Sequence, residues 1–168
     1  MQSRDDQAIA LRQEYLSAMR NLASTVTIVT KANPDGPIGM TATAVCSLSA
    51  DPPAIIICVN NAASLRPALH LGERFAVNLL AKGQADLATC FGGGAARAER
   101  FGFGDWNHDG ECAPFLENAM GALFCTVADI HEYGSHVIIV GRVDRIRRTE
   151  DLSPLLYANG KFVSLSAT

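Results

Sequence analysis

Two long apolar runs joined by only two residues constrain the fold more than any other feature of the chain. The segments GALFCTVADIHEY (121–133) and HVIIVGRVDRIRRT (136–149) are rich in β-branched residues, and only Gly134 and Ser135 separate them. A two-residue connection joins antiparallel strands, because a parallel pair needs a crossover of about a dozen residues or more. The sequence therefore predicts a long β-hairpin within an antiparallel sheet.

β-Branched or alternating runs predict further strands elsewhere in the chain. These runs lie at 24–30, 40–49, 54–60 and 74–80, with a last hairpin expected around Asn159-Gly160 within 155–165. Helices are expected at 5–22, in LRPALHL after Ser64 and at 84–91, and residues 92–118 are expected to form a surface excursion. Because strands and helices do not alternate regularly, the predicted class is mainly β, a barrel with flanking short helices in a single domain over residues 1–168.

Charge and hydropathy exclude several classes of partner. The formal net charge is −3 and 18% of residues are charged, so we expect neither nucleic acid nor an anionic membrane as a partner. No run approaches the roughly 20 apolar residues of a membrane span, and the N-terminus is too charged for a signal peptide. The five cysteines are odd in number and contain no CxxC pair, which argues against a disulfide framework and favours the cytoplasm.

Motifs for hydrolytic or metal-assisted chemistry are missing from the sequence. There is no GxSxG, HExxH or GxxxxGK[ST] pattern, and the four histidines lack the spacing of metal ligands. No metal site is therefore expected. We therefore expect a bound cofactor to supply the chemical reactivity.

Small polar residues at strand ends form the candidate binding site. Thr41, Thr43 and Ser47 are predicted to share one strand face, where small side chains let a flat ligand approach the backbone. Asn60 ends the next strand, and Ser64 is placed to cap a following helix whose N-terminus would attract a phosphate. Alternatively, the threonines could form the solvent-exposed face of a strand without binding a ligand, and Ser64 could be an ordinary helix N-cap.

Three segments taken together resemble the flavin reductase-like family. They are GMTATAVCSLSADPPAIIICVNNAASL (39–65), FAVNLLAKGQADLATCF (75–91) and GSHVIIVGRV (134–143). The resemblance implies a six-stranded antiparallel split β-barrel with Greek-key topology and a homodimer with flavin near the subunit interface. It also implies reduction of FMN or FAD by NADH or NADPH, with the reduced flavin supplied to a partner monooxygenase.

The same resemblance assigns residues to the flavin and the nicotinamide. The flavin positions, with Lys82 and Gln84 as neighbours of the phosphate, are Met40, Thr41, Ala42, Thr43, Ala44, Asn60, Ser64, Phe75, Ala76, Asn78, Lys82 and Gln84. Family members often carry Gly-Asp-His where this chain has Gly134, Ser135 and His136, a motif associated with nicotinamide binding. His136 is the candidate catalytic residue, with a role in binding and orientation. It could equally be a turn histidine.

Two other functions stay open at this point. The protein could keep a fixed flavin and reduce its own substrate, such as a corrin or a metal chelate. It could instead be a flavin- or haem-binding barrel without enzymatic activity. Oxidation of a nicotinamide that depends on added flavin distinguishes the reductase from both.

Overall fold

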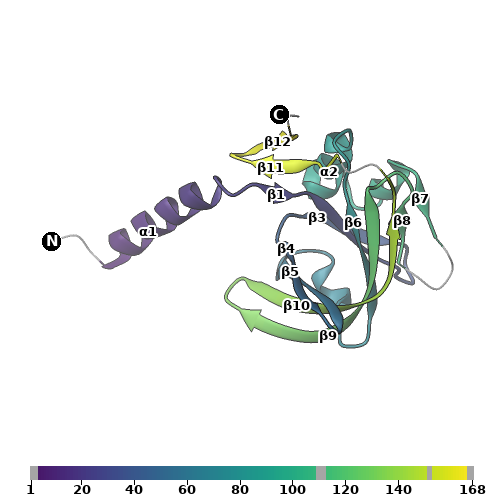
Figure 1. Ribbon diagram of the computed structural model, residues 1–168. Coiled ribbons are helices and arrows are strands. Elements are labelled where there is room, and N and C mark those ends of the chain that lie inside the picture. Colours follow the sequence, from purple (N-terminus) through teal and green to yellow (C-terminus); the bar gives the residue numbers. More distant parts are fainter. Residues whose placement is uncertain (1–3, 109–112, 151–152, 166–168) are drawn as a thin grey trace.

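An antiparallel sheet of seven strands forms the body of the protein (Figure 1). The computed structural model describes residues 4–108, 113–150 and 153–165 of the chain. The sheet has the order β3-β2-β6-β9-β10-β5-β4. In chain order its strands are β2 (Thr27–Lys31), β3 (Ile38–Ala42), β4 (Val45–Ala50), β5 (Pro53–Asn60), β6 (Arg74–Leu79), β9 (Gly121–Tyr133) and β10 (His136–Arg148).

The long hairpin predicted from the sequence is confirmed as β9 and β10. The two strands pair along their whole length, with register shifts between Val140 and Gly141 and between Val143 and Arg145. Gly141 faces the Phe75 ring, and a Cβ at this glycine would lie 2.5 Å from the ring's Cζ atom. The glycine therefore lets the Phe75 ring approach β10 closely in the core.

The segment 40–49, predicted as one strand, divides into two. Its first part pairs with β2 and its second part with β5, so the chain changes neighbours at Thr43 and Ala44. The two parts, β3 and β4, are the two edges of the sheet, which is why it has seven strands where six were expected. The predicted mainly β class is confirmed.

Short strands and helical turns complete the fold. The small strands are β1 (Ser24–Thr25), β7 (Trp106–Asn107), β8 (Phe115–Leu116), β11 (Leu156–Ala158) and β12 (Lys161–Val163). The helical turns are η1 (Arg66–Ala68), α2 (Ala85–Thr89), η2 (Cys90–Gly94) and η3 (Arg100–Gly102). β1 pairs with the β11–β12 hairpin, and β7 pairs with β8.

The stretch 92–118, expected to run over the surface, is partly buried. Phe115 and Leu116 are at most 6% exposed, and Thr30 Oγ1 donates to the Pro114 carbonyl at 2.5 Å. Trp106 packs against the rings of Phe91 and Phe101, with centroids 5.2 and 4.9 Å away. The expectation of a surface excursion was wrong here, because Leu116, Phe101 and Trp106 pack into a second core with α2 residues, and Phe115 packs into a third cluster with Phe124.

The first helix, α1 (Arg4–Met19), projects away from the body (Figure 1). It ends three residues before the predicted boundary at residue 22, and none of its residues is buried. Among the described residues, no helix combines the length and apolar character needed to cross a bilayer.

Candidate functional site

Two turns that lie far apart in the sequence meet at one end of β5 and β10. Asn60 and His136 are direct partners in the antiparallel register of these strands. The Asn61 backbone N–H donates to the Ser135 carbonyl at 2.9 Å, and its side-chain Nδ2 donates to the Gly134 carbonyl at 3.3 Å. The structure thus brings together four of the sequence-predicted residues: Asn60, Gly134, Ser135 and His136.

The imidazole of His136 is exposed at this meeting point and contacts its neighbour in the turn. Its Nδ1 atom lies 2.9 Å from the Ser135 hydroxyl oxygen. That contact engages Nδ1, so Nε2 is the ring nitrogen that an incoming ligand can reach. The side chain of Asn60 is used locally, since its Oδ1 accepts from the Ala62 backbone N–H at 2.8 Å.

Ser64 lies beside a hollow with two arginines, which we call the Ser64 hollow. Its volume is about 380 Å³. Its lining residues are Asn33, Asp35, Gly36, Pro37, Ile38, Gly39, Ser64, Arg97, Ala98 and Arg100. Its lining combines two arginines and the Ser64 side chain with a single carboxylate residue, Asp35, so the hollow has the chemistry of an anion site.

The backbone fixes one of these arginines in place. Arg100 Nη1 donates to the Gly39 carbonyl at 3.1 Å, and its Nε donates to the Ala95 carbonyl at 3.3 Å. Arg97, three residues earlier, is exposed. Sequence reasoning missed both, although two arginines within the small-residue stretch GGGAARAER were a usable signal.

The helix-capping role predicted for Ser64 is wrong. The helical turn after it is only Arg66–Ala68, and Leu65 occupies the cap position without a side-chain hydrogen bond. Pro67 lies in the first turn, where proline is tolerated, and the turn ends at Leu69, whose backbone is extended. The positive charge near Ser64 comes from arginine side chains and not from a helix end.

The threonine-rich segment does not present one continuous face. Thr41 and Thr43 border a hollow of about 460 Å³ under the β11–β12 hairpin, whereas Ser47 borders a separate groove beyond the strand break. The Thr41 hydroxyl donates to the Ala88 carbonyl at 2.6 Å. The expectation that all three share a face was wrong, because the chain changes neighbours between Thr43 and Ser47.

The residues around this break differ in accessibility. Met40 and Ala42 pack into the main core, with Ala42 only 6% exposed. Thr43 and Ala44 are exposed at the corner, where the Ala44 carbonyl accepts from the Cys58 backbone N–H at 3.0 Å. The corner is therefore the part of this segment that a ligand can approach from outside.

Three predicted flavin positions on β6 lie in the core. Phe75, Ala76 and Asn78 are at most 1% exposed. Asn78 Nδ2 donates to the Ile28 carbonyl at 3.0 Å, and its Oδ1 accepts from the Leu116 backbone N–H at 2.8 Å. The Asn78 amide on β6 therefore links β2 and β8 through hydrogen bonds, and in this structure the side chain stabilises the fold.

Lys82 and Gln84 lie apart from the Ser64 hollow. Gln84 accepts from the Ala81 backbone N–H at 2.8 Å and donates to the Asn118 carbonyl at 3.0 Å. It borders a hollow of about 550 Å³, whose described lining carries Asp86 and Asp105 but no lysine or arginine. The two carboxylates disfavour a phosphate there. Neither Lys82 nor Gln84 lines the Ser64 hollow, so the structure does not place these two residues together with Ser64.

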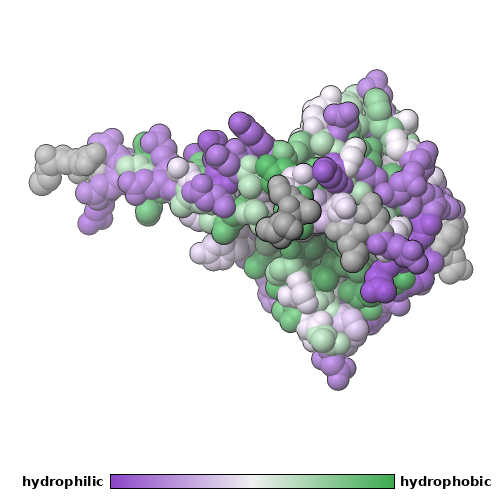
Figure 2. All heavy atoms as spheres, turned by 45° about the horizontal axis from the view of Figure 1, so that its top comes forward, coloured by the Kyte–Doolittle hydropathy of each residue, from purple (hydrophilic) through white to green (hydrophobic). Residues whose placement is uncertain are grey.

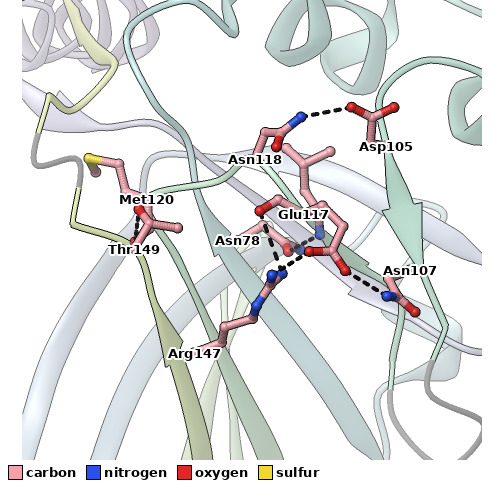
Figure 3. Close-up of polar contacts among 9 residues, drawn as sticks. Asn78, Asp105, Asn107, Glu117, Asn118, Met120, Arg147 and Thr149 are labelled. Atoms are coloured by element: carbon pink, nitrogen blue, oxygen red, sulfur yellow. Dashed lines mark hydrogen bonds and ion pairs between the residues drawn. The ribbon is translucent and has the colours of Figure 1, made fainter.

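A polar network beside Asn78 orders the loops around that acidic hollow (Figure 3). Asn118 donates to Asp105 at 2.7 Å, Asn107 donates to Glu117 at 2.6 Å, and Arg147 forms an ion pair with Glu117. The hydrogen bonds from Asn107 and Arg147 hold the pKa of the Glu117 carboxyl below its usual value. Elsewhere, burial raises the pKa of the Cys125 thiol to about 12, so this cysteine is not a nucleophile.

Comparison with known proteins identifies relatives over nearly the whole chain. The family model described as "Flavin reductase like domain" matches residues 19–166. The FMN reductase (NADH) RutF of Stutzerimonas stutzeri is 34% identical over 161 residues, covering 96% of this chain and 92% of that protein. FMN reductase (NADH) RutF 2 of Methylorubrum extorquens is 37% identical over 158 residues, covering 94% and 91% of the two chains.

Solved structures with the same fold include reductase components. The NADH:FAD oxidoreductase SgcE6 of Streptomyces globisporus, in complex with NAD and FAD fragments, superposes with a TM-score of 0.84 at 29% identity, covering 92% of this chain and 93% of that one. BorF, the flavin reductase component of a bacterial two-component tryptophan halogenase, gives a TM-score of 0.83 at 28% identity, covering 94% and 99%. By sequence and by fold, the chain belongs to the flavin reductase-like family.

Proposed function

We propose that this protein is an NAD(P)H:flavin oxidoreductase whose reduced flavin serves a partner monooxygenase. The observation that carries the proposal is the meeting of the Asn60 and His136 turns, in a chain that matches the flavin reductase family from residue 19 to residue 166. FMN and NADH are the proposed pair, because the curated relatives are named FMN reductase (NADH).

The Ser64 hollow is the proposed site of the flavin phosphate. A phosphate carries up to two negative charges, and paired guanidiniums bind it through charge-assisted hydrogen bonds. Arg100 is already oriented by its bonds to the Gly39 and Ala95 carbonyls, which reduces the ordering cost of binding. The exposed corner at Thr43 and Ala44 is the proposed backbone contact for the ring edge.

The flavin and the nicotinamide supply the redox chemistry when bound: a hydride passes from NAD(P)H to the flavin, which also takes up a proton, leaving NAD(P)⁺. This transfer needs no nucleophile from the protein. The chain's task is to hold two rings in contact and in the correct orientation. His136 Nε2 is the proposed contact to the nicotinamide, with Ser135 holding the imidazole through Nδ1.

A homodimer is proposed through the outer face of β4, β5 and β10. Ile56 and Val140 are partners on this face, and so are Cys58 and Ile138. All four point away from the core side, where Ile57 and Ile139 are fully buried, and all four remain partly exposed. A contiguous apolar patch that remains partly exposed marks an interaction site. Because the face ends at Asn60 and His136, a second copy would border the site.

The cytoplasm is the proposed location. Cys46 and Cys58 lie on the same outer face as free thiols, with Cys46 exposed. Free exposed thiols persist in a reducing compartment. Nicotinamide and flavin pools are available there as well.

Steady-state assays with each nicotinamide and each flavin test the proposal. We expect loss of nicotinamide absorbance that depends on added FMN or FAD and is faster with NADH than with NADPH. Flavin that stays bound through gel filtration without nicotinamide oxidation would point to a binding protein. Oxidation that needs a further organic acceptor, with the flavin retained, would point to an enzyme with a fixed flavin.

A further inference from the structure

A carboxylate lies in the hollow that we propose for the flavin phosphate. Asp35 lines the Ser64 hollow together with Arg97 and Arg100. The two arginines attract a phosphate, whereas Asp35 repels it, because like charges repel each other. Asp35 therefore lowers the affinity that the two arginines alone would give to this site.

A tight turn holds Asp35 in the lining of the hollow. The Gly36 backbone N–H donates to the Asn33 carbonyl at 3.0 Å, which closes the turn over residues 33–36. Pro34 restricts the backbone before Asp35, and Gly36 takes a φ of 108°, a region that favours glycine. The turn therefore leaves the backbone of Asp35 few alternative positions.

The charges of the hollow are not paired with one another. Within the described part of the chain, Asp35, Arg97 and Arg100 form no ion pair. Arg100 instead donates to the carbonyls of Gly39 and Ala95, which carry no net charge. The hollow thus presents two positive charges and one negative charge to a ligand.

The size of the hollow determines how strongly Asp35 acts on a bound phosphate. A volume of about 380 Å³ corresponds to a sphere roughly 9 Å across, so a phosphate inside it lies within about that distance of the carboxylate. The Debye length is about 10 Å at 0.1 M ionic strength, so salt screens this repulsion only in part. A single charge acting at this distance on a phosphate of nearly two charges changes its affinity by about three- to tenfold.

We infer that Asp35 limits the affinity of the Ser64 hollow for the flavin phosphate, so that FMN binds and leaves as a diffusing substrate. The arginines provide the attraction, and the carboxylate offsets part of it. This inference rests on the proposed function, in which reduced flavin has to leave the protein for a partner enzyme. Without the charge of Asp35, the flavin should remain bound for longer.

The variant Asp35→Asn tests the inference, because it removes the charge and keeps the shape of the side chain. FMN and riboflavin are titrated by fluorescence at about 50 mM and about 1 M salt. At low salt we expect Asp35→Asn to bind FMN about three- to tenfold more tightly than the parent protein does, and to release it more slowly. At high salt the ratio should fall towards one. Riboflavin, which lacks the phosphate, should bind both proteins equally.

Three results of these titrations would overturn the inference. The first is an FMN affinity that is unchanged in Asp35→Asn at low salt. The second is a weaker affinity for both flavins, which would mean that the carboxylate accepts hydrogen bonds from the ribityl hydroxyls. The third is equal tightening of riboflavin and FMN, because the phosphate would then not be the group that Asp35 repels.

Two further variants serve as controls. Asp35→Glu keeps the charge, so it should bind FMN like the parent protein. Glu14→Gln makes the same change in net charge on α1, the helix that projects away from the body (Figure 2), and it should also leave FMN binding unchanged. Equal tightening in Glu14→Gln and Asp35→Asn would show that net charge, and not the position of Asp35, controls the affinity.

Assays of NADH oxidation in the same samples separate this inference from the proposed activity. FMN-dependent oxidation by the parent protein, with unchanged FMN affinity in Asp35→Asn, rejects the role of Asp35 alone. Tighter and salt-sensitive FMN binding in Asp35→Asn, without NADH oxidation by either protein, rejects the reductase alone.

Discussion

His136 and Asn60 stand opposite each other in the register of β10 and β5, at the point where both strands meet a turn. This pairing fixes the position of an exposed imidazole on a rigid sheet. The neighbouring turns are joined by hydrogen bonds from Asn61 to Gly134 and Ser135. A side chain held in this way can orient a ligand without itself taking part in bond breaking.

The first prediction concerns His136. His136→Ala removes the proposed nicotinamide contact, so KM for NADH should rise about tenfold, roughly 1.4 kcal/mol of binding, with little change in FMN affinity. Steady-state kinetics and a fluorescence titration with FMN measure the two effects. His131→Ala, on the solvent-exposed part of β9, is the matched control. Equal loss in both variants would show that His136 has no special role.

The second prediction separates two assignments of the flavin phosphate. Arg97→Ala should weaken FMN binding about tenfold or more, since a hydrogen bond to a charged group contributes about 1.5–3 kcal/mol. Lys82→Ala, at an exposed position away from the Ser64 hollow, should leave FMN binding unchanged. Titration with riboflavin, which lacks the phosphate, should show no difference between Arg97→Ala and the parent protein. The opposite ranking of Arg97 and Lys82 would place the phosphate elsewhere.

The third prediction concerns the stability of the fold. Asn78→Ala leaves the Leu116 backbone N–H and the Ile28 carbonyl without their buried partner, which should cost about 2–4 kcal/mol of unfolding free energy. Urea denaturation followed by circular dichroism measures the loss. Asn118→Ala, at an exposed amide, is the control and should cost far less. A stable Asn78→Ala protein with weakened FMN affinity would instead return Asn78 to the ligand site.

The fourth prediction concerns pH. The folded-state pKa of Glu117 is lowered by Asn107 and Arg147, so its stabilising effect is present above the unfolded pKa and is lost as pH falls through the folded value. Glu117→Gln should therefore be less stable than the parent near neutral pH, and the gap should narrow below pH about 4.5. Thermal unfolding at several pH values tests this. Glu99→Gln, in an exposed turn, should show no such convergence.

Local pattern predicted the strands well where pairing partners are close in sequence. The run 121–149 specified β9, β10 and their turn, because one short connection permits only one arrangement. The break at Thr43 and Ala44 could not be predicted in this way. The break arises because the first half of the segment pairs with β2 and the second half pairs with β5. The alternating pattern of residues 40–49 carries no information about which strand each half pairs with.

The candidate site could be assembled from the sequence only in part, for the same reason. Asn60 and His136 lie at the ends of predicted strands, so the sequence indicated both. Asn78 is a polar residue of the kind that often binds ligands. Its amide is instead bonded to Leu116, which lies 38 residues later in the sequence, and local pattern does not reveal this contact. Arg97 and Arg100 line the same hollow as Ser64 because of the course of the loop that carries them. A loop has no periodic sequence pattern from which this position could be predicted.

In the proposed flavin site, the corner at Thr43 and Ala44 would link ligand occupancy to the integrity of the sheet. Because residues 38–50 supply both edge strands, their detachment would free the two margins of the sheet together. A ligand held by the corner backbone favours the attached state by mass action. Detachment of residues 38–50 and release of the ligand would therefore be coupled. The sheet should resist local opening most strongly when the ligand is bound.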